Sequence, residues 1–244
     1  MDQQPGHTPS HTHGTLLDGR IQYAQHRKGY RTGIEPVLLA AGIPAHPGDH
    51  VLEAGCGAGA ALLCLLWRVP GLTATGIELN PATAALARQN LQANNRTATI
   101  QTTDVTTAAL PPIHNHVLAN PPWHSPASTV PPGTRRALAT HGTGLPRWIA
   151  ALTAAVAPGG TLTLILPDAQ SPHAAALMAI HLPHVTILPF APKPGRPPKL
   201  TLLQARHGPP AIARLPPRTL HAPNGRYTPE LDAILRDGAP IPFT

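Results

Sequence analysis

Charged side chains are scarce in this sequence, at 12% of 244 residues, and acidic ones are scarcer than basic ones. Eighteen Lys and Arg against 11 Asp and Glu leave a formal net charge of +7, and the isoelectric point is near 10.3. A positive excess favours a polyanionic partner such as nucleic acid. The alternative is that the excess only keeps a protein of low charge content in solution.

Cysteines and long apolar runs are also rare. Cys56 and Cys64 are the two cysteines, and one helix would hold both on a single side about two turns apart, too far for a disulfide. We therefore expect reduced thiols and a cytoplasmic protein. No apolar run reaches the roughly 18 residues of a membrane span, and residues 1–15 do not resemble a secretory signal. These absences predict a soluble protein without a membrane partner.

The chain is predicted to form one domain after a short tail. Residues 1–14 are polar and rich in histidine, so we expect a flexible tail rather than a metal site at His7, His11 and His13. Residues 15–244 show no internal repeat and no second core. Thirty-two prolines predict long, stiff loops.

Strands alternate with helices along most of the domain. This alternation predicts a doubly wound, mostly parallel α/β sheet of seven strands with helices on both faces. The strands are expected from Val51 to the glycines that follow it and at 72–80, 98–102, 116–119, 160–166, 184–189 and 200–205. The helices are expected at 36–41, 60–67, 81–94, 148–157 and 171–181.

A glycine-rich turn joins the first of these strands to its helix. Gly55, Gly57 and Gly59 allow positive φ and let a ligand approach where a Cβ would block it. The following helix directs its free N–H groups at that ligand. We interpret the turn as a cofactor cradle that the preceding segment 20–43 could cover. The pattern is only moderately specific, because dinucleotide sites use a related turn.

Three acids follow or close successive strands. Glu53 precedes the turn, Glu78 ends the second strand, and Asp104 follows the third. Glu78 lies close to the spacing at which an acid reaches a ribose in dinucleotide folds, and Asp104 could accept from an adenine amine. Alone, these two would be a helix cap and a turn residue. Three acids at the carboxyl edge favour S-adenosylmethionine, which carries a sulfonium and an ammonium but no phosphate, over NAD.

The fourth strand runs into Asn120, Pro121, Pro122 and Trp123. The two prolines stiffen the turn, so the Asn120 side-chain oxygen and the Pro121 carbonyl could both accept from one exocyclic NH₂ group. Such a grip favours a pyramidal nitrogen whose lone pair points at a methyl donor. Trp123 offers a face on which a planar base can stack. A rigid surface turn is the alternative.

The cradle, the acids Glu78 and Asp104, and the tetrapeptide 120–123 occur in the order of a class I S-adenosylmethionine-dependent methyltransferase. Together with residues 29–39 and 226–238, they resemble the tRNA1(Val) adenine N6-methyltransferase family over residues 16–240. The resemblance implies methylation of an adenine beside the anticodon of a valine tRNA. It also implies that the cofactor is held by Glu53, Gly55, Gly57, Gly59, Glu78, Asp104 and Asn120.

The sequence departs from the family pattern at three positions. Glu35 and Glu53 stand where Asp is common, and Trp123 stands where Tyr or Phe is usual. The carboxylate changes keep the chemistry, whereas Trp123 reshapes the pocket and leaves open which base in which RNA is taken.

RNA contacts are predicted only from charge, since phosphate binding needs surface cations at no particular spacing. The candidates are Lys28, Arg31, Arg135, Arg136, Lys193, Arg196 and Lys199. Solvated loop faces are the alternative for each. No metal is expected, because methyl transfer of this kind requires none and the histidines near the tetrapeptide show no ligand spacing. These histidines are His114, His116, His124 and His141. A monomer is expected.

Three other functions stay open. A protein-glutamine methyltransferase would use the same tetrapeptide on a side-chain amide, but those enzymes carry a sizeable recognition domain before the cradle, where this chain has about fifty residues. A non-catalytic binding protein on the same fold would not need Asn120. NAD-linked chemistry would require affinity for a dinucleotide.

Overall fold

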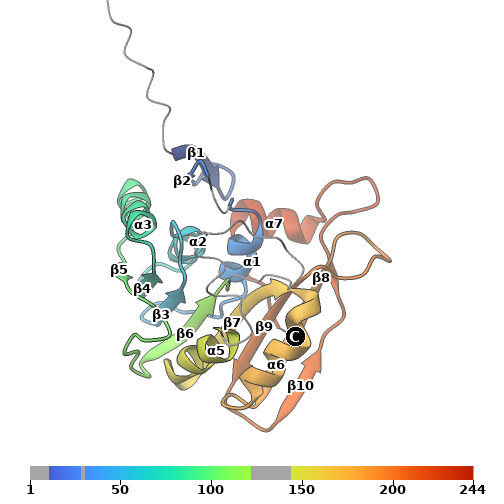
Figure 1. The fold of residues 1–244 in the computed structure, drawn as a ribbon. Coiled ribbons are helices and arrows are strands. Elements are labelled where there is room, and N and C mark those ends of the chain that lie inside the picture. Colours follow the sequence, from blue (N-terminus) through green and yellow to red (C-terminus); the bar gives the residue numbers. More distant parts are fainter. Residues whose placement is uncertain (1–10, 29–30, 122–143, 244) are drawn as a thin grey trace, which may run out of the picture.

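The computed structural model describes residues 11–28, 31–121 and 144–243 (Figure 1). Within those ranges, one large sheet has the strand order β10-β8-β9-β7-β6-β3-β4-β5, with β11 beside β8, and a separate hairpin pairs β1 with β2. The strands of the large sheet are β3 (His50–Ala54), β4 (Thr73–Glu78), β5 (Thr99–Thr102), β6 (His114–Ala119), β7 (Val156–Pro167), β8 (His184–Ala191), β9 (Leu200–Arg206), β10 (Ala211–Arg214) and β11 (Arg218–Thr219).

The seven predicted strands are β3 to β9, and the predicted doubly wound fold is confirmed. Among β3 to β9, all neighbouring pairs are parallel except the two that involve β9, which runs antiparallel to both β7 and β8. Because β9 reverses direction and β8 reverses it again, the carboxyl end of β8 lies at the same edge as those of β3, β4 and β6. Strands β10 and β11, which we did not predict, extend the sheet in parallel beyond β8.

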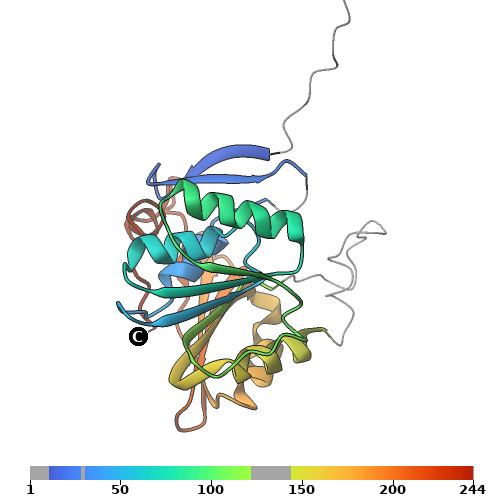
Figure 2. The ribbon, with the colours of Figure 1, turned by 90° about the vertical axis from the view of Figure 1, so that its left-hand side faces the viewer.

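Helices cover both faces of the sheet, as expected. Figure 2 shows α2 and α3 on one side and α5 and α6 on the other. The helices are α1 (Glu35–Ala41), α2 (Ala60–Arg68), α3 (Pro81–Ala93), α5 (Gly144–Ala154), α6 (Ser171–Ala179) and α7 (Pro229–Asp237), with a 3-10 turn at Asp168–Gln170. Two apolar clusters fill the two interfaces, one centred on α1 and α2 and the other on α5 and α6.

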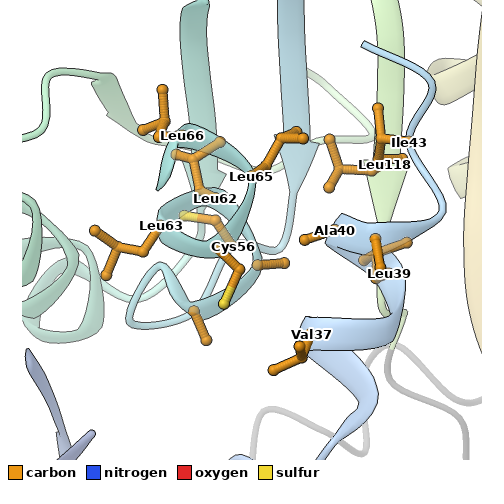
Figure 3. Close-up of a cluster of buried hydrophobic side chains, with 14 of the residues drawn as sticks. Val37, Leu39, Ala40, Ile43, Cys56, Leu62, Leu63, Leu65, Leu66 and Leu118 are labelled. Carbon is orange, nitrogen blue, oxygen red and sulfur yellow. The ribbon is translucent and has the colours of Figure 1, made fainter. Parts of the chain in front are cut away.

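Helices α1 and α2 run side by side in the same direction. In Figure 3, Val37 lies toward the end of α2 that is next to Cys56, whereas Ile43 lies near the height of Leu65, toward the other end of α2. Both helices bury apolar side chains in the first cluster. The amino-terminal end of α1 therefore lies on the same side as the glycine turn, consistent with the expectation that this segment flanks the cradle.

The hairpin β1 (His11–Leu16) and β2 (Ile21–His26) corrects the predicted tail. Residues 11–14, which we expected to be flexible, form most of β1 and pair with β2. Polar side chains such as those of His11 and His13 give no apolar pattern. The hairpin is instead held by backbone pairing and by the buried side chains of Leu17, Ile21 and Tyr23. Residues 1–10 lie outside the described part of the chain.

Two asparagines of α3 attach the hairpin to the domain. The backbone N–H and carbonyl of Ala24 pair with the Asn90 side-chain amide at 2.9 and 2.8 Å. One turn further on, the N–H and carbonyl of Gln22 pair with Asn94 at 2.8 and 2.7 Å. The outer edge of β2 is thus paired with helix side chains in place of a third strand, which leaves it closed to other chains.

Candidate active site

The candidate site lies where three neighbouring parallel strands end at the same level. Ala54 of β3 is the register partner of Ile77 in β4 and of Ala119 in β6. Adjacent strands lie about 4.8 Å apart. The next residues along the three strands therefore stand side by side at the carboxyl edge of the sheet: Glu78, Gly55 and Asn120.

The turn after β3 has the backbone that its glycines predict. The φ angles are +66° at Gly55, +56° at Gly57 and +85° at Gly59, all in the left-handed region. The space beside each glycine differs. A Cβ on Gly57 would meet nothing within 4 Å, whereas one on Gly59 would lie 3.6 Å from Ala87 on α3. Gly57 is therefore where a ligand can approach the backbone, and Gly59 allows close packing of α3.

Glu78 holds this turn in place. Its Oε2 accepts a hydrogen bond from the Gly57 N–H at 3.1 Å, and its Oε1 accepts from the Asn80 N–H at 2.7 Å. Each carboxylate oxygen has a second lone pair, and the side chain is only half-buried, so it keeps acceptor capacity toward a ribose. Binding of the ribose by Glu78 stays a prediction.

Glu53 lies beneath the turn, with 4% of its surface exposed. Its Oε2 accepts from the N–H of Leu62 in the first turn of α2 at 2.9 Å. Burial, opposed by this hydrogen bond and assisted by the charge of Glu78, raises the pKa of Glu53 to about 8. The contact we observe braces the start of α2, and direct cofactor binding by Glu53 stays a prediction.

Asp104 follows β5, which is in register with β4 so that Thr102 pairs with Glu78. Asp104 Oδ1 accepts from both the N–H and the hydroxyl of Thr106 at 2.8 Å. This is the turn contact that we weighed as the alternative. The predicted adenine contact therefore falls to the second carboxylate oxygen and stays untested.

Asn120 and Pro121 follow β6 directly, with Asn120 half-buried and Pro121 buried. The register of β3 and β6 places Asn120 beside Gly55. The two acceptors predicted for the amine and the glycine turn therefore lie next to each other at one edge of the sheet. Pro122 and Trp123 lie outside the described residues, as do Arg135 and Arg136.

Comparisons with known proteins agree with this geometry. The family model of the methyltransferase small domain matches residues 35–180, well over half of the chain. The chain belongs to the methyltransferase small-domain family. A tRNA1(Val) (adenine(37)-N6)-methyltransferase from Porphyromonas gingivalis is 29% identical over 222 residues, covering 82% of this chain and 85% of that protein. This methyltransferase thus uses S-adenosylmethionine as its cofactor.

Solved structures show the same fold. A predicted O-methyltransferase from Agrobacterium tumefaciens matches this methyltransferase with a TM-score of 0.72 at 22% identity, covering 85% of this chain and 98% of that one. A 16S rRNA N2 G1207 methyltransferase from T. Thermophilus, solved in complex with AdoMet and guanosine, has a TM-score of 0.57 at 18% identity and covers 81% of this chain and 50% of that one.

A cationic cofactor fits the residues of the methyltransferase. Gly57 has open space beside its α-carbon, and Glu78 lies next to it with acceptor capacity. At the start of α1, the Glu35 Oε2 atom is buried and has no hydrogen-bond partner among the described residues. A buried carboxylate oxygen without a donor is costly, and a cofactor ammonium would satisfy it. We noted Glu35 in the sequence only as a departure from the family.

Trp148 of α5 is a site residue that the sequence analysis missed. A Cβ built on Gly55 would lie 3.0 Å from Cη2 of the Trp148 indole, so the ring rests against the first glycine of the turn. The side chain is only partly buried. Trp148 stands in an apolar helical pattern typical of a core residue, so the sequence carries no signal for this position.

The predicted RNA-binding cations are exposed wherever the structure describes them: Lys28, Arg31, Lys193, Arg196 and Lys199. The last three lie between the carboxyl end of β8 and the start of β9, at the same sheet edge as Asn120. Arg31 donates to the hydroxyl of Thr12 in β1 at 2.8 Å and lies four residues before Glu35, the first residue of α1. The loop that carries Lys193, Arg196 and Lys199 therefore lies at the sheet edge of the candidate site, and Arg31 lies close in sequence to the amino-terminal end of α1.

The described histidines of β6 are structural. His114 bonds to the Ala155 carbonyl, and His116 bonds to Thr161 and Asp49. Burial lowers the pKa of both imidazoles, so they favour the neutral form. Among the described residues, no group of three His, Cys, Asp or Glu could hold a metal, and no helix is long and apolar enough to cross a membrane.

Proposed function

We propose that this methyltransferase transfers a methyl group from S-adenosylmethionine to N6 of an adenine in a tRNA of the tRNA1(Val) type. The observation that carries the proposal is the register of β3 and β6, which puts Asn120 beside Gly55. The name of the P. gingivalis relative, similar over 82% of this chain, supports both the RNA substrate and the acceptor atom.

Asn120 and Pro121 would act on the acceptor nitrogen. The Asn120 side-chain oxygen and the Pro121 carbonyl accept the two N–H bonds of the amine, which turns its lone pair away from the ring and toward the cradle. S-adenosylmethionine supplies a methyl group on a positively charged sulfur. The nitrogen held by Asn120 and Pro121 would receive this methyl group through its lone pair and would lose its extra proton to water. The grip stabilises the pyramidal transition state more than the planar ground state.

The cofactor would bind along the row of strand ends. The cofactor would approach the protein backbone at Gly57. Glu78 would accept from its ribose hydroxyls, and Asp104 would accept from its adenine amine. Glu35 would accept from the ammonium. Asn120 stands at the far end of the same row, where cofactor and acceptor meet, and Glu53 keeps the turn in position from beneath.

The RNA would enter from the carboxyl edge of the sheet. Its target base must be unpaired or flipped, because a paired adenine hides its amine, and Trp123 would stack on it. Lys193, Arg196 and Lys199 lie in the loop that starts three strands from β6, about 14 Å along the edge. That distance suits contacts with phosphates next to the flipped nucleotide.

The test is incubation with labelled S-adenosylmethionine and total tRNA from cells that lack the gene, followed by nucleoside mass spectrometry. N6-methyladenosine in tRNA is expected. Label on a guanine of ribosomal RNA would overturn the adenine assignment, and label only in protein would overturn the RNA assignment. Asn120→Ala should abolish turnover while cofactor affinity stays within about tenfold. Asn115→Ala, in the same strand but at its amino end, is the matched control and should stay active.

A further inference from the structure

Charges at the turn of the β1–β2 hairpin are balanced by ion pairs. Asp18 pairs with Arg236 at 3.0 Å, and Arg20 pairs with Asp237 at 2.9 Å. Both partners belong to α7, which lies beside the turn of the hairpin in Figure 2. These four side chains together carry no net charge.

The open end of the hairpin, by contrast, carries positive charge without a counterion. Lys28 lies two residues after the end of β2, and Arg31 donates to the hydroxyl of Thr12 in β1, which is a neutral partner. Both cations are exposed. Within residues 11–28, 31–121 and 144–243, no carboxylate lies within ion-pair distance of either one. This end of the hairpin can therefore attract an anion.

Hydrogen bonds fix the segment of Arg31 against the hairpin. The N–H of Thr32 donates to Oε1 of Gln25 at 3.0 Å, and the Thr32 hydroxyl lies 3.0 Å from that of Tyr23. Both partners belong to β2, whereas Arg31 itself bonds to β1. Because the backbone at this position is already ordered, an anion that binds there costs less conformational entropy than one bound by a loose linker.

The open end lies beside the candidate site. His26, the last residue of β2, has its Nε2 atom 3.3 Å from the hydroxyl oxygen of Thr83 in the first turn of α3. The Thr83 N–H donates to the side chain of Asn80, and the Asn80 N–H donates to Glu78. Direct contacts thus join the hairpin to the carboxyl end of β4. In Figure 2, this end of the hairpin lies on the side away from α7.

The two groups of exposed cations stand on opposite sides of Asn120. The loop with Lys193, Arg196 and Lys199 starts at β8, three strands from β6 in one direction along the sheet. The hairpin contacts the end of β4, two strands from β6 in the other direction, or about 10 Å. A flipped nucleotide at Asn120 would have phosphates on both sides of it, so it would present anions to both groups.

We propose that the open end of the hairpin binds RNA phosphates on the β4 side of the flipped nucleotide. Lys28 and Arg31 supply the charge, and the loop 193–199 holds the strand on the other side. The RNA is thereby restrained at two places with its target base between them. The inference rests on the proposed RNA substrate, but it does not depend on which base is methylated.

The test measures binding of total tRNA without cofactor between about 50 and 200 mM salt. The variant K28Q/R31Q should lower the slope of log affinity against log salt by about two units, since each lost phosphate contact removes about one. The affinity advantage of the parent over this variant should therefore shrink about tenfold across that range. The variant K28R/R31K keeps both charges and should keep the parent slope. Loss of slope in both variants would mean that hairpin structure, and not charge, is responsible.

The matched control is R20Q/R236Q, which removes two charges beside the same hairpin but at its turn. Exposed ion pairs contribute little to stability, so the control should fold and keep the parent slope. Equal losses in K28Q/R31Q and R20Q/R236Q would reveal a general effect of net charge and overturn the proposal. A steep slope in the parent that K28Q/R31Q retains would overturn only the role of the hairpin. A parent whose tRNA affinity is independent of salt would contradict the RNA substrate as well.

Discussion

Removal of the Asn90 amide is the sharpest test of how the hairpin supports the site. This side chain is 3% exposed and makes three hydrogen bonds of 2.8 to 2.9 Å. Two join it to the backbone of Ala24 in β2, and the third runs from its Nδ2 to the carbonyl of Ala58 in the glycine turn. Asn90→Ala would therefore remove one of the two asparagine attachments of the hairpin and release one carbonyl of the turn.

The expected loss of stability follows from the groups left behind. Alanine at position 90 would leave the N–H and carbonyl of Ala24 and the carbonyl of Ala58 without their partners. Each lost bond costs about 1 kcal/mol net, and each buried group left unsatisfied costs about 1 to 3 kcal/mol. Because water can reach part of the opened edge of β2, we expect a total near the low end, about 3 to 5 kcal/mol.

Asn94→Ala is the matched control, since the side-chain amide of Asn94 also makes three hydrogen bonds to backbone groups, two to Gln22 and one to the Asn90 carbonyl. Its partner Gln22 is exposed, so water replaces the lost bonds and the cost should stay within about 1 kcal/mol. Urea unfolding of both variants measures the two free energies, and calorimetry should show weaker cofactor binding for Asn90→Ala only. Equal losses in the two variants would refute the link between hairpin and turn.

Three further predictions concern pH, the turn and the substrate. The pKa of Glu53 is about 8 in the folded protein and near 4.5 when unfolded, so the folded state binds more protons between these values and stability falls as the pH rises through them. Urea titrations at several pH values should show a smaller fall in stability with rising pH for Glu53→Gln than for the parent, and an unchanged slope would contradict the assignment. Gly57→Ala should cost about 1 to 2 kcal/mol of stability, because φ there is +56°, and weaken calorimetric cofactor binding at least about tenfold; binding equal to the parent would mean the ligand lies elsewhere. Replacing Lys193, Arg196 and Lys199 with Gln should reduce the salt dependence of tRNA affinity by about one slope unit per phosphate contact, and an unaltered slope would place the RNA on another surface.

The parts of the fold that were predicted are those with strong local signals. Most strands from β3 to β9 carry apolar or β-branched runs, so they were predicted, and the glycines at 55, 57 and 59 predicted their turn. The hairpin was missed because it is held by backbone pairing between β1 and β2 and by Asn90, which bonds to Ala24 of β2 from 66 residues further along the chain. Strand β10 is exposed at all four positions, so it has no apolar period to detect.

The candidate site was predicted only where one residue type implies one chemistry. Asn120 and the glycines lie at one edge of the sheet because the carboxyl ends of parallel strands share an edge. The order of strands and motifs in the sequence already implied this placement. The contacts of Glu53 and Trp148 depend on how helices α2 and α5 pack across the sheet. Neither helix reveals its packing partners by periodicity alone, so neither the hydrogen bond from Leu62 to Glu53 nor the contact of Trp148 with Gly55 could be predicted.

The glycine turn is restrained from several sides before any ligand binds. Glu78 accepts from the Gly57 N–H, Asn90 donates to the Ala58 carbonyl, and the Cys56 N–H donates to the Ile77 carbonyl at 2.9 Å. A turn rich in glycine would otherwise lose much conformational entropy on binding. Since these bonds impose that loss during folding, the turn is ordered before any ligand binds, as transition-state stabilisation by a preorganised site requires. Asn90 bonds both to the hairpin and to the turn, so the hairpin contributes to this order. The hairpin therefore supports glycines that lie some forty residues further along the chain.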